Sequence, residues 1–179
     1  MHSHISIKYL VLAGLFTTFT AVGAFIKIPF YPVPFTLQSL FPVLAGMYLI
    51  PRYAVGSQLA YLILGLMGLP VFANGGGIGY ALQPTFGYLL CLPLAAGLVS
   101  WLYRDSDRMF FIWIKSSLGL LLILIGGALW LYFNLTVVAQ SQVSFIKTVV
   151  SGAVIFFPSM LLKSIVVTVL GSKLHPQRL

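Results

Sequence analysis

The chain has 179 residues, of which 60% are hydrophobic and only 7% are charged. Because an ordinary soluble domain carries about 25% charged residues, this composition excludes a water-soluble fold and predicts a polytopic membrane protein. The formal net charge of +8 would suggest nucleic-acid binding in a soluble protein. Here the basic residues are scattered singly at the ends of apolar runs, where membrane topology explains them, so we expect no nucleic-acid partner.

The apolar runs predict an all-α membrane protein with six transmembrane helices in one bundle and a single domain covering residues 1–179. The expected spans are residues 7–26, 36–50, 53–69, 85–103, 109–133 and 145–170. At 1.5 Å per residue the second and third spans reach only about 23–25 Å, less than the roughly 30 Å of a hydrocarbon core. Spans this short fit better inside a bundle, or beside a cavity, than alone in lipid.

Basic residues are distributed unevenly between the two sides of the predicted bundle. Both termini and the turns at 51–52 and 104–108 share one side, which carries Lys8, Arg52, Arg104, Arg108, Lys173 and Arg178. The opposite side carries Lys27 and Lys147. The positive-inside rule therefore predicts a multi-pass protein of the cytoplasmic membrane with both termini in the cytoplasm.

The segment at 69–88, LPVFANGGGIGYALQPTFGY, lies between two apolar runs and on the predicted outer side. Four of its residues are closely spaced glycines, which allow positive φ angles and a close approach of the backbone to another group. Its polar side chains are uncharged: Asn74, Tyr80, Gln83, Thr85 and Tyr88. A mostly apolar segment with a few placed polar groups is typical of a pocket wall, and an interfacial turn fits the composition equally well.

Lys163 lies deep in the last predicted span. A buried ammonium in a membrane marks a functional site by default. Neither acid of the chain can neutralise it, because Asp105 and Asp107 lie in the loop before the fifth span. Its partner must be backbone carbonyls, water or an anionic ligand, and we favour the ligand over a structural role. Gln38 and Gln58, on the short spans, likewise need partners from other helices or from a ligand.

Enzyme functions are disfavoured by what the spans lack. No carboxylate or histidine lies within them, and neither a Ser/His/Asp arrangement, a metal-ligand spacing nor a Walker A sequence occurs. We expect a binding or permeation protein with no catalytic residues, no metal, no cofactor and no ATPase activity of its own. A membrane-embedded enzyme remains the disfavoured alternative.

Small residues recur every four positions in the first span, at Ala13, Thr17 and Ala21. Such a stripe allows another helix to approach closely within lipid. From the residues alone, that helix can belong to this chain or to a partner.

Three blocks of sequence resemble the BioY family, the biotin-specific substrate-binding (S) components of energy-coupling-factor (ECF) transporters. The blocks are VGAFIKIPFYPVPFTLQSLFPVLAG, PRYAVGSQLAYLILGLMGLPVFANGGG and QPTFGYLL. The resemblance implies a six-helix bundle with an outward-facing biotin pocket under the first loop. It also implies a separate transmembrane T component with two ATPase subunits as partners, and it assigns the stripe at Ala13, Thr17 and Ala21 to contact with the T component.

The resemblance also suggests binding residues. Asn74 and Lys163 are carried over as substrate-binding residues, with Tyr88 and Gln38 as groups of the pocket wall. This chain departs from the family at two motifs: PGDLIK reads PSMLLK, with Met160 in place of an Asp, and GPTGGYL reads QPTFGYL, with Gln83 in place of a Gly. Without that acid we expect Lys163 to bind the biotin carboxylate and Gln83 to supply an acceptor for the ureido N–H groups.

Two further functions stay open at this point. A solitary facilitator of the same fold would carry biotin without ATPase partners. A capture subunit for a related carboxylate, such as lipoate or a biotin precursor, would explain the changes at Met160 and Gln83.

Overall fold

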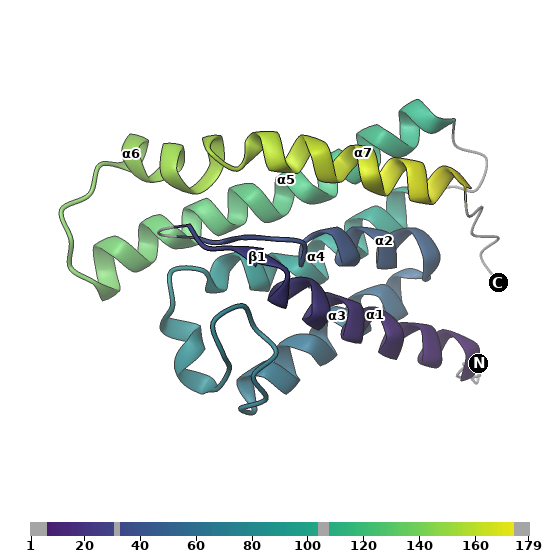
Figure 1. The fold of residues 1–179 in the computed structure, drawn as a ribbon, viewed down its shortest axis with the longest axis horizontal. Coiled ribbons are helices and arrows are strands. Elements are labelled where there is room, and N and C mark those ends of the chain that lie inside the picture. The colour runs from purple at the N-terminus through teal and green to yellow at the C-terminus, as the bar shows by residue number, and fades with distance from the viewer. Residues whose placement is uncertain (1–6, 31–32, 104–107, 174–179) are drawn as a thin grey trace.

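The computed structural model describes residues 7–30, 33–103 and 108–173, most of which are helical. Its helices are α1 (Ile7–Phe25), α2 (Leu40–Tyr48), α3 (Pro51–Leu66), α4 (Phe86–Leu102), α5 (Met109–Phe133), α6 (Phe145–Val149) and α7 (Phe157–Lys173). The π-helical turn Val150–Val154 joins α6 to α7, so that the pair runs as one interrupted helix (Figure 1). The described residues therefore form six helical segments, which confirms the predicted all-α bundle.

The helices differ in whether they can cross a membrane. Ile7–Phe25, Met109–Val138 and Phe145–Ser172 are long and apolar enough to do so, and Phe86–Leu102 is a shorter apolar helix. Helix α2 has 9 residues, which at 1.5 Å per residue gives only about 14 Å of the roughly 30 Å core. Most of its residues are buried. Helix α2 therefore lies inside the bundle and is too short to cross a membrane on its own.

Helix α2 begins at Leu40, four residues later than the start of the predicted span at 36. The preceding residues form an antiparallel β-hairpin in which β1 (Lys27–Ile28) pairs with β2 (Phe35–Thr36). Prolines before and within this stretch disfavour a helix there. The hairpin rests on the turn that precedes α7, because the Phe35 ring stacks on Phe156 with 4.3 Å between centroids.

The segment between α3 and α4, which we call the glycine loop (67–85), folds back against the end of α3. The backbone N–H of Gly77 donates to the carbonyl of Gly65 at 2.7 Å. Gly68, Gly75 and Gly77 have φ angles of 110°, 113° and 101°, a region that other residues rarely adopt. Phe72 is fully buried and anchors the loop. The glycines are therefore needed for the path of this loop.

Close packing in the core depends on small residues in the helices. A Cβ added to Gly46 of α2 would lie 2.7 Å from the carbonyl oxygen of Ala96 in α4. A Cβ added to Gly127 of α5 would lie 2.1 Å from the ring of Tyr88 in α4. These two glycines allow α4 to pack tightly against α2 on one side and against α5 on the other.

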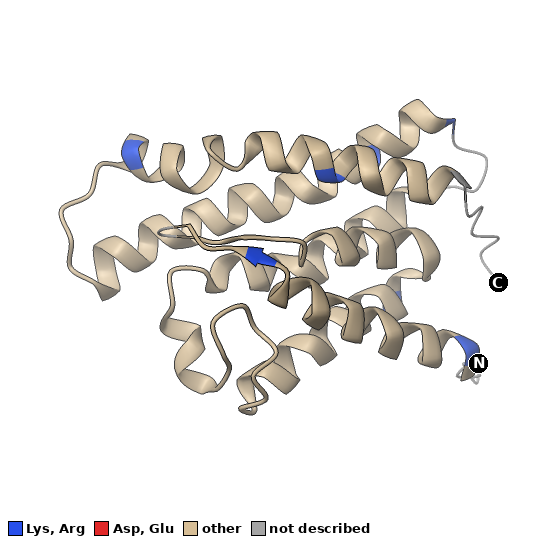
Figure 2. Cartoon of the chain, viewed as in Figure 1, with Lys and Arg blue, Asp and Glu red and all other residues tan. Residues whose placement is uncertain are grey.

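Both ends of the described chain lie at the same end of the bundle (Figure 1). Basic residues gather toward that end, and few lie at the opposite end (Figure 2). The hairpin and the glycine loop lie away from the termini. The bundle therefore has a basic end and a nearly uncharged end.

Candidate ligand-binding pocket

A pocket lies beneath the hairpin, between α2, the glycine loop and helices α4, α5 and α7. Its floor is apolar and comes from α4 and α5. The floor residues are Leu89, Leu92, Leu120, Ile123 and Leu124. Polar groups enter from the hairpin, the start of α2, the glycine loop and α7. An apolar cavity with a few converging polar groups is the usual form of a small-molecule site.

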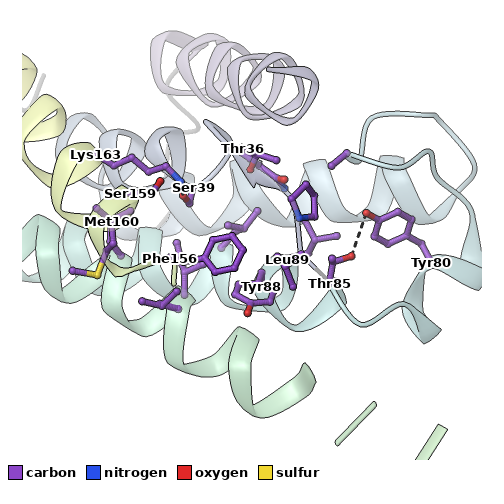
Figure 3. Close-up of a pocket in the computed structure, with 18 residues that line it drawn as sticks. Thr36, Ser39, Tyr80, Thr85, Tyr88, Leu89, Phe156, Ser159, Met160 and Lys163 are labelled. Atoms are coloured by element: carbon purple, nitrogen blue, oxygen red, sulfur yellow. Dashed lines mark hydrogen bonds between the residues drawn. The ribbon is translucent and has the colours of Figure 1, made fainter. Parts of the chain in front are cut away.

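The cationic side of the pocket is built by α7 and the start of α2. The Lys163 ammonium reaches into the pocket and donates to Ser39 Oγ at 3.0 Å. Ser159 lies one helical turn before Lys163 and lines the same side (Figure 3). Among the described residues no carboxylate side chain occurs. Lys163 is therefore a positive charge in an apolar bundle whose protein partner is a neutral hydroxyl.

The position of α2 adds to this positive potential. Ser39 is the N-cap residue of α2, and a helix N-terminus carries a partial positive charge. An ammonium at that end of a helix is unfavourable unless an anion lies near both. The geometry of Lys163, Ser39 and α2 therefore suits the carboxylate of a ligand.

The neutral side of the pocket faces α3 and the glycine loop. Gln38 Nε2 donates to the Tyr61 hydroxyl at 3.1 Å, and this hydroxyl donates to the carbonyl of Val71 at 2.9 Å. Farther along, Thr85 Oγ1 donates to the Tyr80 hydroxyl at 3.4 Å (Figure 3). This side offers hydrogen bonds but no charge.

Of the six predicted binding residues, four line the pocket: Gln38, Tyr88, Met160 and Lys163. Their roles as ligand contacts stay predictions. The Tyr88 hydroxyl already donates its proton to the carbonyl of Gly152 at 2.6 Å. The ring of Tyr88 forms part of the pocket wall. Met160 is buried and supplies an apolar wall, so the charge on this face comes from Lys163 alone.

The other two predicted residues lie outside the pocket lining. Asn74 is exposed, and its Oδ1 accepts a hydrogen bond from Lys27 Nζ at 3.1 Å, while its neighbour Ala73 lines the pocket. Gln83 is exposed at the end of the short 3₁₀ helix Ile78–Leu82, where its carbonyl accepts from Trp130 Nε1. In this structure Gln83 is therefore not placed to supply the acceptor expected of it.

Sequence reasoning missed Ser39, Ser159 and Phe156 as pocket residues. The spacing of Ser159 and Lys163, four apart on a helix, could have identified Ser159, because such residues share a face. Ser39 carried no such signal, since its position depends on where the hairpin ends and α2 begins.

The small-residue stripe of α1 is used within the chain. Ala13 is buried, and the Thr17 hydroxyl donates to its carbonyl and, at 2.8 Å, to the carbonyl of Ser57 in α3. Ala21 is half-buried against the core cluster around Tyr61. On the outer face of the same helix Gly14 and Thr18 are exposed. In this conformation the predicted partner stripe contacts α3.

The comparisons with known proteins agree with this architecture. A profile of the BioY family matches residues 1–178. A probable biotin transporter BioY of Lysinibacillus sphaericus is 47% identical over 131 residues, 72% of this chain and 66% of that protein. Another from Pyrococcus horikoshii is 36% identical over 169 residues, 94% of this chain and 96% of that protein.

A solved structure extends the likeness to the fold. The crystal structure of the S-component for biotin from an ECF-type ABC transporter superposes with a TM-score of 0.84 at 29% identity, covering 99% of this chain and 95% of that one. Fold, family profile and relatives all lead to the same assignment. The chain belongs to the BioY family.

Proposed function

We propose that this protein captures biotin and takes it up across the cytoplasmic membrane as the substrate-binding component of an ECF-type ABC transporter. The observation that carries the proposal is the pocket, with the ammonium of half-buried Lys163 on one side and neutral hydrogen-bonding groups on the other. Biotin has matching chemistry, because it carries a carboxylate at one end and an uncharged ureido ring at the other. The names of the relatives and the structural neighbour support the same ligand.

The carboxylate lies at Lys163 in this proposal, and the ring lies toward the neutral side. Lys27, the other lysine near the pocket, is less suited to the carboxylate because its ammonium already donates to the Ala73 carbonyl and to Asn74 Oδ1. Among the described residues, the Ser39 hydroxyl is the one hydrogen-bond partner of the Lys163 ammonium. A charge-assisted hydrogen bond from Lys163 to the ligand would supply the counter-charge that α7 lacks.

Energy for uptake comes from separate subunits, a transmembrane T component with two ATPases. We propose that the outer face of α1 meets the T component at Gly14 and Thr18, the exposed small residues beside the predicted stripe. A Cβ at Gly14 would have nothing within 4 Å, and we expect a larger side chain at this exposed position to leave the fold intact. Gly14→Trp should therefore preserve biotin binding and abolish uptake in cells, whereas Leu129→Trp, on the exposed face of α5, should preserve both.

The basic end of the bundle supports an orientation with the termini in the cytoplasm. The hairpin and the glycine loop then face outside, where they would admit ligand. A cysteine-labelling experiment on intact cells tests this: a cysteine at exposed Ile78 of the glycine loop should react with a membrane-impermeant reagent. Labelling only after permeabilisation would reverse the orientation.

Biotin binding by the purified protein in detergent tests the proposal directly, with a Met160→Asp variant beside it. Saturable, tight binding by the wild type supports a pocket that works without an acid at this position. No binding by the wild type together with binding by Met160→Asp would mean that the natural ligand is another molecule. Met160 and the absence of a pocket carboxylate among the described residues favour a related carboxylate vitamin or precursor as that second candidate.

A further inference from the structure

We infer that Gln38 turns its amide oxygen toward the pocket to accept a hydrogen bond from a ligand N–H group, and that Tyr61 is the positioning residue that fixes this orientation. The inference deepens the proposed function and rests on it for the identity of the ligand. It follows from the direction of two hydrogen bonds.

The Tyr61 hydroxyl has one proton. It lies 2.9 Å from the carbonyl oxygen of Val71, which can only accept, so the proton is used there. The same hydroxyl lies 3.1 Å from the side-chain amide of Gln38, toward which it can only act as an acceptor. The NH₂ group of Gln38 must therefore face Tyr61. Reversing the amide would place two oxygens against each other, unless the Tyr61 hydroxyl gave up its hydrogen bond to the Val71 carbonyl.

Burial keeps this arrangement in place. Tyr61 is 0% exposed and Gln38 is 6% exposed, so neither can exchange its partner for bulk water. The ring of Tyr61 packs edge-on against Phe72, with centroids 5.4 Å apart, and Phe72 anchors the glycine loop. Tyr61 is therefore held on both its ring and its hydroxyl, and it in turn holds Gln38.

In the part of the chain that the structure describes, this arrangement leaves the amide oxygen of Gln38 without a hydrogen-bond partner, together with one of the two N–H groups of the amide. Gln38 lines the pocket, and no hydrogen bond to its Oε1 occurs among the described residues. Within the same residues Ser117 Oγ is the buried side-chain atom that lacks a partner, so Gln38 Oε1 is open to the cavity rather than sealed. A carbonyl-type oxygen facing an apolar cavity is a site for a donor.

Three other polar groups of the pocket are poorly suited to this role. Lys163 can only donate, the Ser39 hydroxyl accepts from Lys163, and the Tyr88 hydroxyl donates to Gly152. Among the lining residues Gln38 carries the one amide, and no carboxylate accompanies it. With Met160 on the wall of α7, the amide of Gln38 is the strongest acceptor for the N–H groups of a ureido ring.

The test compares biotin with its cyclic carbonate analogue, in which oxygens replace the two ureido N–H groups. Affinities are measured for the wild type, Gln38→Met and Tyr61→Phe in detergent. We expect the wild type to prefer biotin, and Gln38→Met to lose roughly ten- to a hundredfold in biotin affinity, with no loss for the analogue. Tyr61→Phe frees the amide to rotate and should reduce the preference by roughly three- to tenfold.

An equal loss of both ligands in Gln38→Met would mean that the side chain only fills space, and it would overturn the inference. An unchanged preference in Tyr61→Phe would overturn the positioning role. A second readout does not need the ligand: in protein labelled with ¹⁵N-glutamine, the Gln38 NH₂ resonances should shift in Tyr61→Phe. If the wild type binds neither ligand, biotin is excluded as the ligand, while this shift still tests whether the Tyr61 hydroxyl contacts the Gln38 amide.

Discussion

The two sides of the pocket are built in opposite ways. On the cationic side, Lys163 depends on a single serine hydroxyl, beside a helix N-terminus that repels it. On the neutral side, Gln38 donates to the Tyr61 hydroxyl, which in turn donates to the Val71 carbonyl, so these groups are held by hydrogen bonds within the protein. One side therefore needs a ligand to complete its electrostatics, and the other is organised before the ligand arrives. The first side should therefore select for the negative charge of the ligand, and the second for its N–H groups.

The largest expected effect comes from removing the charge. Lys163→Met keeps the length of the side chain and should lower biotin affinity by roughly a hundredfold or more, because the carboxylate would enter an apolar bundle without a counter-charge. Isothermal titration of the purified variant measures this. Lys8→Met, at the exposed start of α1, is the matched control and should bind as the wild type does. If Lys163→Met bound biotin as tightly as the wild type does, the cationic side would not be the place where the carboxylate binds.

A smaller effect is expected from the floor that both sides share. Gly127→Ala would place a Cβ 2.1 Å from the Tyr88 ring and push that ring toward the cavity. Such overpacking costs roughly 1–3 kcal/mol, so the melting temperature and the affinities for biotin and its neutral analogues should fall together. Gly14→Ala, at an open position of α1, is the control. A loss of affinity confined to anionic ligands would contradict the assignment of Tyr88 to the common wall.

The smallest effect should come from the cover of the pocket. Lys27 of the hairpin donates to the Ala73 carbonyl and to Asn74 Oδ1, and so connects the hairpin to the glycine loop. Since these contacts are exposed, we expect Lys27→Met to raise the dissociation rate of biotin by only roughly two- to fivefold. Stopped-flow displacement measures this rate, and Lys27→Arg should restore the wild-type value. A hundredfold loss of affinity would place the ligand carboxylate at Lys27.

Much of this architecture could be predicted from the sequence, because lipid imposes strong rules. The apolar runs predicted the six-helix bundle. The high free-energy cost of an ammonium in an apolar span indicated that Lys163 belongs to a functional site, and the structure places it in the pocket lining. Gln38 was expected to need a partner, and Tyr61 now provides it. These three predictions depend only on amino-acid composition and on how far a residue lies from the ends of its span, and both can be read from the sequence.

Other features depend on local geometry that the pattern does not contain. Helix α2 begins at Leu40 and not at the predicted residue 36, because Phe35 and Thr36 pair with β1 in the hairpin. Gln83 and Asn74 lie outside the pocket lining because the turns of the glycine loop decide which side chains face inward. Likewise, the spacing of Ala13 and Thr17 indicates a close helix contact, and the structure identifies α3 as the helix that takes it.

The most direct test of the account is a cycle that changes the charge of the ligand and of the protein together. Biotin and biotinamide, which lacks the negative charge, are titrated into the wild type and Lys163→Met. We expect the wild type to prefer biotin strongly and this preference to disappear in the variant. An equal preference for biotin in both proteins would contradict it, because the carboxylate would then be bound at a place other than Lys163.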